Sequence, residues 1–128
     1  MAYETAGIDV GTFTASADLS SSQYYFVKMS GDNTVTVCAA VTDKPIGVLQ
    51  NKPESGDQAI VRVFGVSKVS ADATLAAGNV AGTSADGQCQ PVSAGSETTV
   101  FNCGQVLTGG AAGTLQSVLI TISNSRAA

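Results

Sequence analysis

The sequence contains no histidine and no tryptophan, and it has only three cysteines among its 128 residues. Without histidine, the Ser-His-Asp and Cys-His arrangements that activate most nucleophiles cannot form. Zinc sites built from cysteine and histidine are disfavoured as well, because the cysteines are widely spaced and no CxxC pair occurs. Neither GxxxxGK[ST] nor a helix-opening GxGxxG is present. The sequence therefore indicates a protein that is not an enzyme, with no cofactor, no metal and no small-molecule substrate.

Charged residues are also scarce, at 12% of the chain compared with about 25% in an average protein. The net charge is −4, and the six basic residues are scattered along the sequence. Nucleic acid binding requires a clustered basic face, so it is not expected here. No apolar run approaches the roughly 20 residues of a membrane-spanning helix. The opening residues MAYETAGIDV do not resemble a signal peptide, which predicts synthesis and folding in a cytoplasm.

The few charges leave a surface rich in neutral Ser, Thr, Gly and Ala. Such a surface costs little to desolvate, which suits packing against other protein molecules. A component of an assembly and an ordinary, weakly charged monomer both fit this composition. The cysteines also leave two interpretations open. Cys38, Cys89 and Cys103 are either reduced, small apolar side chains, or Cys89 and Cys103 form a bridge between neighbouring strands.

What the sequence does contain is a series of short segments with strand-like alternation. Their spacing and turn signals are typical of a sandwich or barrel, and no helix is long enough for a parallel crossover connection. The predicted fold is all-β: a small single-domain barrel or a tulip-like or sandwich β fold with an extended N-terminal arm. The weakly apolar residues 1–22 are the predicted arm, and residues 23–128 are the β domain. Strands are predicted at residues 23–29, 34–41, 46–49, 58–64, 66–69, 80–84, 88–92, 99–107 and 114–123.

Residues 58–64 have the clearest pattern. One face is uniformly apolar and should look into the core, whereas the other mixes a charge with two large apolar groups: the first carries Ala59, Val61 and Val63, and the second carries Ile60, Arg62 and Phe64. The mixed face suits partial cover by the arm or by a partner subunit. Gly65 predicts a bulge or bend after this strand.

Three further local patterns lead to predictions. Asp86-Gly87 predicts a two-residue hairpin turn between the strands around residues 80–84 and 88–92. Residues 70–77 are compatible with a helix but short, so they predict a strand or a single turn. Asp57, Asp72 and Asp86 could hold a hard cation only if folding brought them together, because their spacing matches no calcium loop.

The order of these segments resembles that of the small decoration (cement) proteins of tailed-phage heads. The matching segments are IGVL, a polar loop, AIVRVFGVSKV and the glycine-punctuated GNVAGTSADG. The segment Gly104 to Leu107, followed by Gly113 and Val118 to Ile120, is similar to the closing part of that family. The resemblance covers residues 44–122 and consists of strands and glycines, with no catalytic fingerprint.

The resemblance implies a small barrel or tulip-like β protein that binds the outer surface of an expanded icosahedral head. Such proteins commonly sit as trimers at or near three-fold positions and clamp neighbouring major capsid subunits against internal DNA pressure. It therefore implies a homo-trimer whose partner is the major capsid protein and whose place is the outer capsid surface of the virion, after synthesis in the host cytoplasm. It also implies no enzymatic activity and no cofactor.

In related proteins an N-terminal arm often contacts the capsid lattice, and the resemblance makes the arm of this chain a candidate contact. The capsid-contact candidates are Tyr3, Ile8, Val10 and Phe13, and the subunit-contact candidates are Ile60, Arg62 and Phe64. On this hypothesis, deletion of residues 2–13 leaves the domain folded but abolishes binding to heads. The alternatives are a head-fibre or cell-surface carbohydrate-binding β module, and a self-assembling tube or spike subunit.

Overall fold

The computed structural model describes residues 2–5, 7–93, 95, 96 and 98–122. The described residues form nine strands in a single sheet and contain no helix, which confirms the all-β prediction. The strands are β1 (Ile8–Ala15), β2 (Phe26–Gly31), β3 (Thr34–Val37), β4 (Gly47–Leu49), β5 (Gln58–Ser70), β6 (Val80–Thr83), β7 (Cys89–Val92), β8 (Gly104–Val106) and β9 (Leu115–Thr121).

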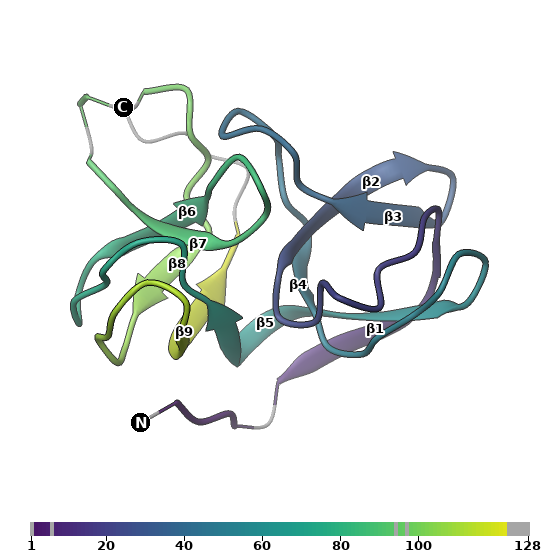
Figure 1. Ribbon diagram of the computed structural model, residues 1–128, viewed down its shortest axis with the longest axis horizontal. Helices are drawn as coiled ribbons and strands as arrows, with labels where there is room; N and C mark the ends of the chain where they lie inside the picture. Colours follow the sequence, from purple (N-terminus) through teal and green to yellow (C-terminus); the bar gives the residue numbers. More distant parts are fainter. Residues whose placement is uncertain (1, 6, 94, 97, 123–128) are drawn as a thin grey trace.

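The sheet is folded into two lobes that share β5. In the first lobe, the order β1-β3-β2-β4-β5 returns to its start, because β1 pairs with β3 in parallel and with β5 antiparallel. In the second lobe, the far half of β5 pairs with β9, and the sheet continues through β8 and β6 to β7. A bridge between Ala71 and Cys89 joins β7 to the residue that follows β5. Figure 1 shows β5 running from one lobe into the other.

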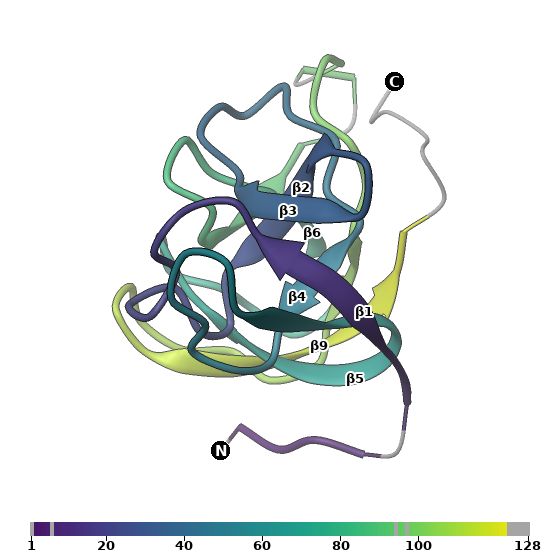
Figure 2. The ribbon, with the colours of Figure 1, turned by 90° about the vertical axis from the view of Figure 1, so that its right-hand side faces the viewer.

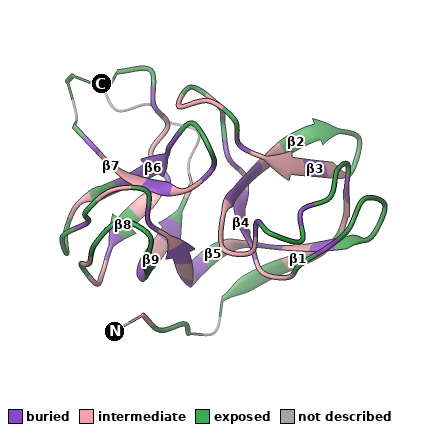
Figure 3. Ribbon diagram, viewed as in Figure 1, coloured by how far each residue is buried: buried purple, intermediate pink, exposed green. Residues whose placement is uncertain are grey.

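Each lobe has its own apolar cluster, and β2 and β4 lie between the two clusters. Successive side chains of a strand point to opposite faces. Phe26 and Val48 accordingly join the cluster that includes β6 to β9, whereas Val27 and Leu49 join the cluster inside β1 to β5. All three residues of β4 are buried, as Figure 3 shows. Burial of both faces explains why IGVL is a continuous apolar run with no polar alternation.

Gly65 lies where β5 passes from one lobe to the other. The strand is continuous over 13 residues, and Gly65 has a φ of +112°, a conformation that other residues rarely adopt. Its neighbour Phe64 pairs with Ile8 of β1 and with Thr121 of β9. The predicted bend therefore corresponds to the change of partner strands, and β5 is not interrupted there.

The hairpin of β6 and β7 forms as predicted, but its turn differs from the prediction. The amide of Ser84 donates to the carbonyl of Gln88 at 2.7 Å, which leaves three residues in the loop and not two. Gly87 has a φ of +87° and occupies the last loop position. In this type of three-residue loop, a turn is followed by a residue with positive φ. Glycine adopts that conformation without strain, as it also does in a two-residue hairpin turn. The Asp-Gly pair located the hairpin but did not determine its loop length.

Three segments contain less regular structure than predicted. Of residues 34–41, only Thr34 to Val37 form a strand, β3. Of residues 99–107, only Gly104 to Val106 form a strand, β8. Residues 70–77 contain no helix, and isolated bridges at Ala71 and Leu75 tie this segment to the sheet.

The predicted arm, residues 1–22, is not separate from the sheet. From Ile8 onward it forms β1, which pairs with β5 over most of its length, and Ala15 and Leu19 are buried in the core of the first lobe. Figure 2 shows β1 crossing the face of this lobe, with the preceding residues running along the β5–β9 side. The thin apolar content was misleading because main-chain hydrogen bonds to β5, which need no apolar side chains, hold β1 in place. Deletion of residues 2–13 would remove most of this strand.

Candidate functional site

Residues 2–5, called the strap below, lie against the outer side of the β5–β9 pair. The hydroxyl of Ser117 on β9 accepts a hydrogen bond from the Tyr3 amide and donates one of 2.7 Å to the Tyr3 carbonyl. The Thr5 amide donates to the Val66 carbonyl on β5 at 3.5 Å. Ser117 is fully buried, and Figures 1 and 2 both place this end of the chain beside β5 and β9.

Arg62 fastens the strap and β1 to β5. Its guanidinium holds Asp9 with two hydrogen bonds, of 2.7 and 3.1 Å, and lies 3.9 Å from Glu4. One nitrogen, Nη1, donates to the carbonyls of Val66 at 2.8 Å and Thr5 at 3.3 Å. The hydrogen bond with Asp9 raises the pKa of Arg62 above its ordinary value, so the group stays charged. This predicted subunit-contact residue is therefore occupied by contacts within its own chain.

Ile8 and Phe64 form an exposed apolar pair beside the strap. They are direct cross-strand neighbours on β1 and β5, and their exposed fractions are 58% and 52%. Large apolar side chains this exposed and this close together are a typical feature of an interaction surface. One residue comes from the predicted capsid-contact set and the other from the predicted subunit-contact set. The structure brings the two sets together at this point.

The other predicted contact residues have less surface available. Tyr3 is 43% exposed, at the start of the strap. Val10 is half-buried opposite Val61, and Phe13 packs against the core of the first lobe. Ile60 is half-buried, and its amide donates to the side chain of Asn51 at 3.1 Å. Contact roles for these residues stay predictions.

Sequence reasoning missed Ser117 and Asp9 as members of this surface. Ser117 occurs in the run TLQSVLITIS, where a serine between Gln116 and Val118 looks like an ordinary exposed position. Its role depends on the strap lying over it, which no local pattern reveals. Asp9 and Arg62 are opposite charges 53 residues apart, and only the register of β1 on β5 identifies them as partners.

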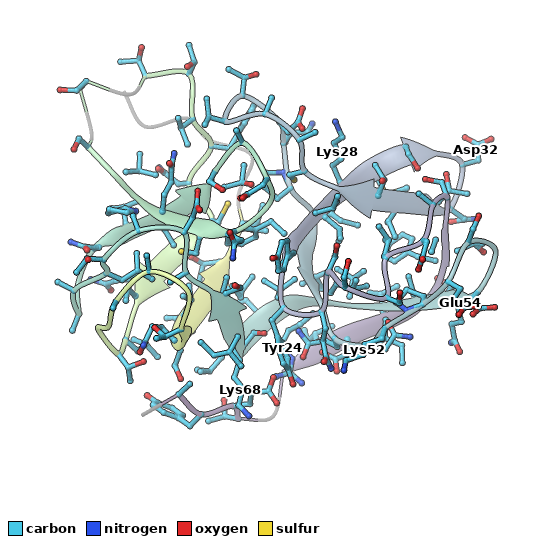
Figure 4. All side chains as sticks on the ribbon, viewed as in Figure 1. Tyr24, Lys28, Asp32, Lys52, Glu54 and Lys68 are labelled. Carbon is cyan, nitrogen blue, oxygen red and sulfur yellow. The ribbon has the colours of Figure 1, made fainter. Side chains whose placement is uncertain are left out.

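Tyr24 connects the two lobes close to this surface. Its amide donates to Leu49 in the first lobe at 2.8 Å, and its carbonyl accepts from Ser70 at the end of β5 at 3.0 Å. Tyr24 has a φ of +69°, which is unusual for a bulky residue. Lys68 lies 6.0 Å from its ring centre, and Figure 4 shows the two side chains on the same side of the molecule. Tyr24 thus fixes the junction between the lobes.

The structure brings together only two of the three aspartates considered for a cation. With its nitrogen facing the carboxylates, the Gln88 amide donates to Asp72 at 3.2 Å and Asp86 at 3.1 Å, and its oxygen accepts from Ser70. Asp57 lies in another turn, where it accepts from the Glu54 amide at 3.2 Å. Within the described part of the chain, no group of three acidic, cysteine or histidine residues is arranged to hold a metal ion.

The three cysteines are free thiols in the core of the second lobe. Burial raises the pKa of Cys38 and of Cys89 to about 12, and burial likewise raises the pKa of Cys103. A thiol that does not ionise is a poor nucleophile, so these groups act as small apolar side chains. The sequence left open reduced cysteines or a Cys89–Cys103 bridge, and in the structure all three cysteines are reduced.

Comparison with known proteins adds a fold relationship. No protein-family model and no curated protein sequence matches the chain. Among solved structures, the crystal structure of the head fibre gp8.5 N base of bacteriophage phi29 matches with a TM-score of 0.67 and 22% sequence identity. The match covers 93% of this chain and 98% of the other. The chain has the fold of a phage head-fibre base. This result agrees with the resemblance to tailed-phage head proteins that the order of strands and glycines indicated.

Within the described residues, no helix has the length and apolar character required to cross a bilayer.

Proposed function

We propose that the protein is a structural component of a phage head, bound to the outer surface of the capsid through contacts with the major capsid protein. The observation that carries this proposal is the fold shared with the phi29 head-fibre base over 98% of that chain. The weakly charged surface is consistent with it, because a neutral surface is cheap to desolvate against another protein. The same proposal places the protein on the virion.

A decoration (cement) role is the first candidate within this class. As a homo-trimer near three-fold positions, the protein would clamp neighbouring capsid subunits, and many copies acting together would need only modest contacts each. A second candidate is the base of a head fibre, because the matching structure is a head-fibre base. A fibre base must attach to the head but has no need to stabilise it, which makes the two roles separable by experiment.

The exposed Ile8–Phe64 pair, with Tyr3 nearby in sequence, is our candidate contact surface. Its two side chains offer apolar area that the chain itself leaves uncovered. Arg62 supports this surface by holding β1 and the strap, and it has little exposed area of its own because its side chain is 12% exposed. We assign Arg62 a positioning role rather than a direct contact.

The decisive experiment mixes the purified protein with undecorated heads and images them by electron microscopy. Density at fixed positions on the outer surface is expected, and absence of binding to heads of the protein's own phage would contradict the proposal. The double variant Ile8→Ser with Phe64→Ser should bind at least about tenfold more weakly while remaining folded, because a central apolar contact is lost. Met29→Ser is the matched control, since Met29 is 43% exposed on β2.

A second measurement separates the two candidate roles. A cement protein should raise the temperature at which heads release their DNA, because binding across subunits stabilises the assembled shell. A fibre base should leave that temperature unchanged at full occupancy. Light scattering of the free protein tests the trimer: a molar mass of one chain at all concentrations would contradict it.

A further inference from the structure

Most hydrogen bonds of the strap are made by its backbone, and the Glu4 carboxylate adds an ion pair with Arg62 at 3.9 Å. The Ser117 hydroxyl binds both the amide and the carbonyl of Tyr3, and the carbonyl of Thr5 accepts from Arg62. The Thr5 amide also donates to the carbonyl of Val66. Tyr3 and Thr5 are alternate residues, as expected when an extended segment turns every second residue toward a sheet. Any extended segment with free amides at these two positions can make the same bonds.

The strap is held to this site by polar contacts, with little apolar burial. Its bond from Thr5 to Val66 is long, at 3.5 Å, and the Tyr3 side chain remains 43% exposed. Segments with few buried apolar contacts are the ones that open at low free-energy cost. Once the strap leaves, the Ser117 hydroxyl loses its two partners in Tyr3 and can bind the amide and carbonyl of another backbone in the same place.

We propose that the outer side of the β5–β9 pair around Ser117 is a binding site for an extended peptide, and that the strap of a second copy occupies it. The chain carries both the site and its ligand, so exchange between copies would replace each bond by an identical one. The remaining cost is the lost freedom of two molecules. High local concentration on a lattice would offset that cost, and this part of the argument rests on the proposed function.

The test uses an isotope-labelled variant that lacks residues 2–5 as the receptor and the unlabelled intact protein as the donor. Backbone amide resonances of Val66, Ser117 and Leu119 in the receptor are expected to shift saturably as the donor is added. A donor with Tyr3→Pro has no amide hydrogen for Ser117 and should bind at least about tenfold more weakly. Unchanged resonances, or equal shifts with both donors, would overturn the proposal.

A second measurement covers the case in which the shortened receptor does not fold. Labelled and unlabelled intact protein are mixed and then examined for magnetisation transfer between molecules. Transfer between Tyr3 of one copy and Ser117 of the other is expected, because these two residues are hydrogen-bonded in the strap contact, and purely intramolecular transfer would overturn the proposal. Neither measurement involves heads, so loss of strap exchange with normal head binding, or the reverse, separates this inference from the proposed function.

Discussion

The Arg62 contacts lead to a quantitative prediction for Arg62→Met, which keeps the length of the apolar stem and removes the guanidinium. The variant loses both bonds to Asp9 and the Nη1 bonds to the carbonyls of Thr5 and Val66. Asp9 is 36% exposed, so water can solvate its carboxylate once the partner is gone. The loss is therefore that of the contacts themselves, with no added penalty for a buried, unpaired charge.

The magnitude follows from the exposure of the partners. A partly exposed ion pair contributes about 0.5 to 1 kcal/mol after screening by water. The bonds from a charged donor to two carbonyls add about 1 to 1.5 kcal/mol. Arg62→Met should thus reduce the free energy of unfolding by about 2 kcal/mol. For a domain of this size, that corresponds to a melting temperature lower by about 6 to 8 °C.

Urea unfolding of the wild type, Arg62→Met, Asp9→Asn and the double variant gives the coupling free energy of the pair. We expect about 0.5 to 1 kcal/mol, decreasing as salt is added because an exposed pair is screened. A coupling near zero at low salt would show that the ion pair does not hold β1 to β5. If Arg62→Met melts at the wild-type temperature, the role assigned to Arg62 as the fastening of the strap is wrong.

Three other predictions concern the core, a turn and the thiols. Leu49→Ala should reduce the free energy of unfolding, measured in urea, by about 3 kcal/mol because Leu49 is fully buried. Leu115 is 40% exposed, so Leu115→Ala should reduce it by under about 1 kcal/mol. Equal losses would contradict the core assignment. Gly87→Ala should destabilise the protein more than Gly56→Ala, since both have positive φ but only Gly87 would press its new Cβ against neighbouring atoms; similar melting temperatures would refute this. The pKa of Cys38 and Cys89 is raised by burial from 9.0 to about 12, so the folded thiols stay neutral while unfolded ones ionise, and stability should fall as pH rises from about 9 toward about 12. The free energy of unfolding measured across that pH range tests the predicted fall, and stability that rises with pH would contradict it.

Much of the fold was predictable because its signals are local. The apolar face of Ala59, Val61 and Val63 and the turn at Asp86-Gly87 each depend on neighbouring residues, and the structure has strands and a hairpin there. The sequence predicted an extended arm over residues 1–22 but not that Ile8–Ala15 form a strand of the sheet, because the evidence for β1 is not local. Its pairing with β5 joins residues about 50 positions apart through main-chain bonds, which leave little trace in side-chain pattern.

The candidate surface was less predictable than the fold. The mixed face of Ile60, Arg62 and Phe64 did indicate cover by the N-terminal residues or by a partner, and the strap does contact Arg62. The alternation alone could not distinguish these two kinds of cover. The contribution of Ser117 could not be predicted, because Ser117 looks like an ordinary exposed serine until the strap is placed over it.

The shared strand β5 has a consequence for how the molecule melts. Because β5 pairs with β1 in one lobe and with β9 in the other, neither lobe can unfold without leaving β5 unpaired on one side of the other lobe. Strand β4 adds to this dependence because its two faces are buried in different apolar clusters, Val48 in one and Leu49 in the other. Loss of one cluster would therefore expose one face of the strand that supports the other. The two halves should therefore behave as one cooperative unit, with a single sharp transition by every probe. In the proposed place on the outside of a head, such cooperativity would remove the half-opened states that proteases attack first.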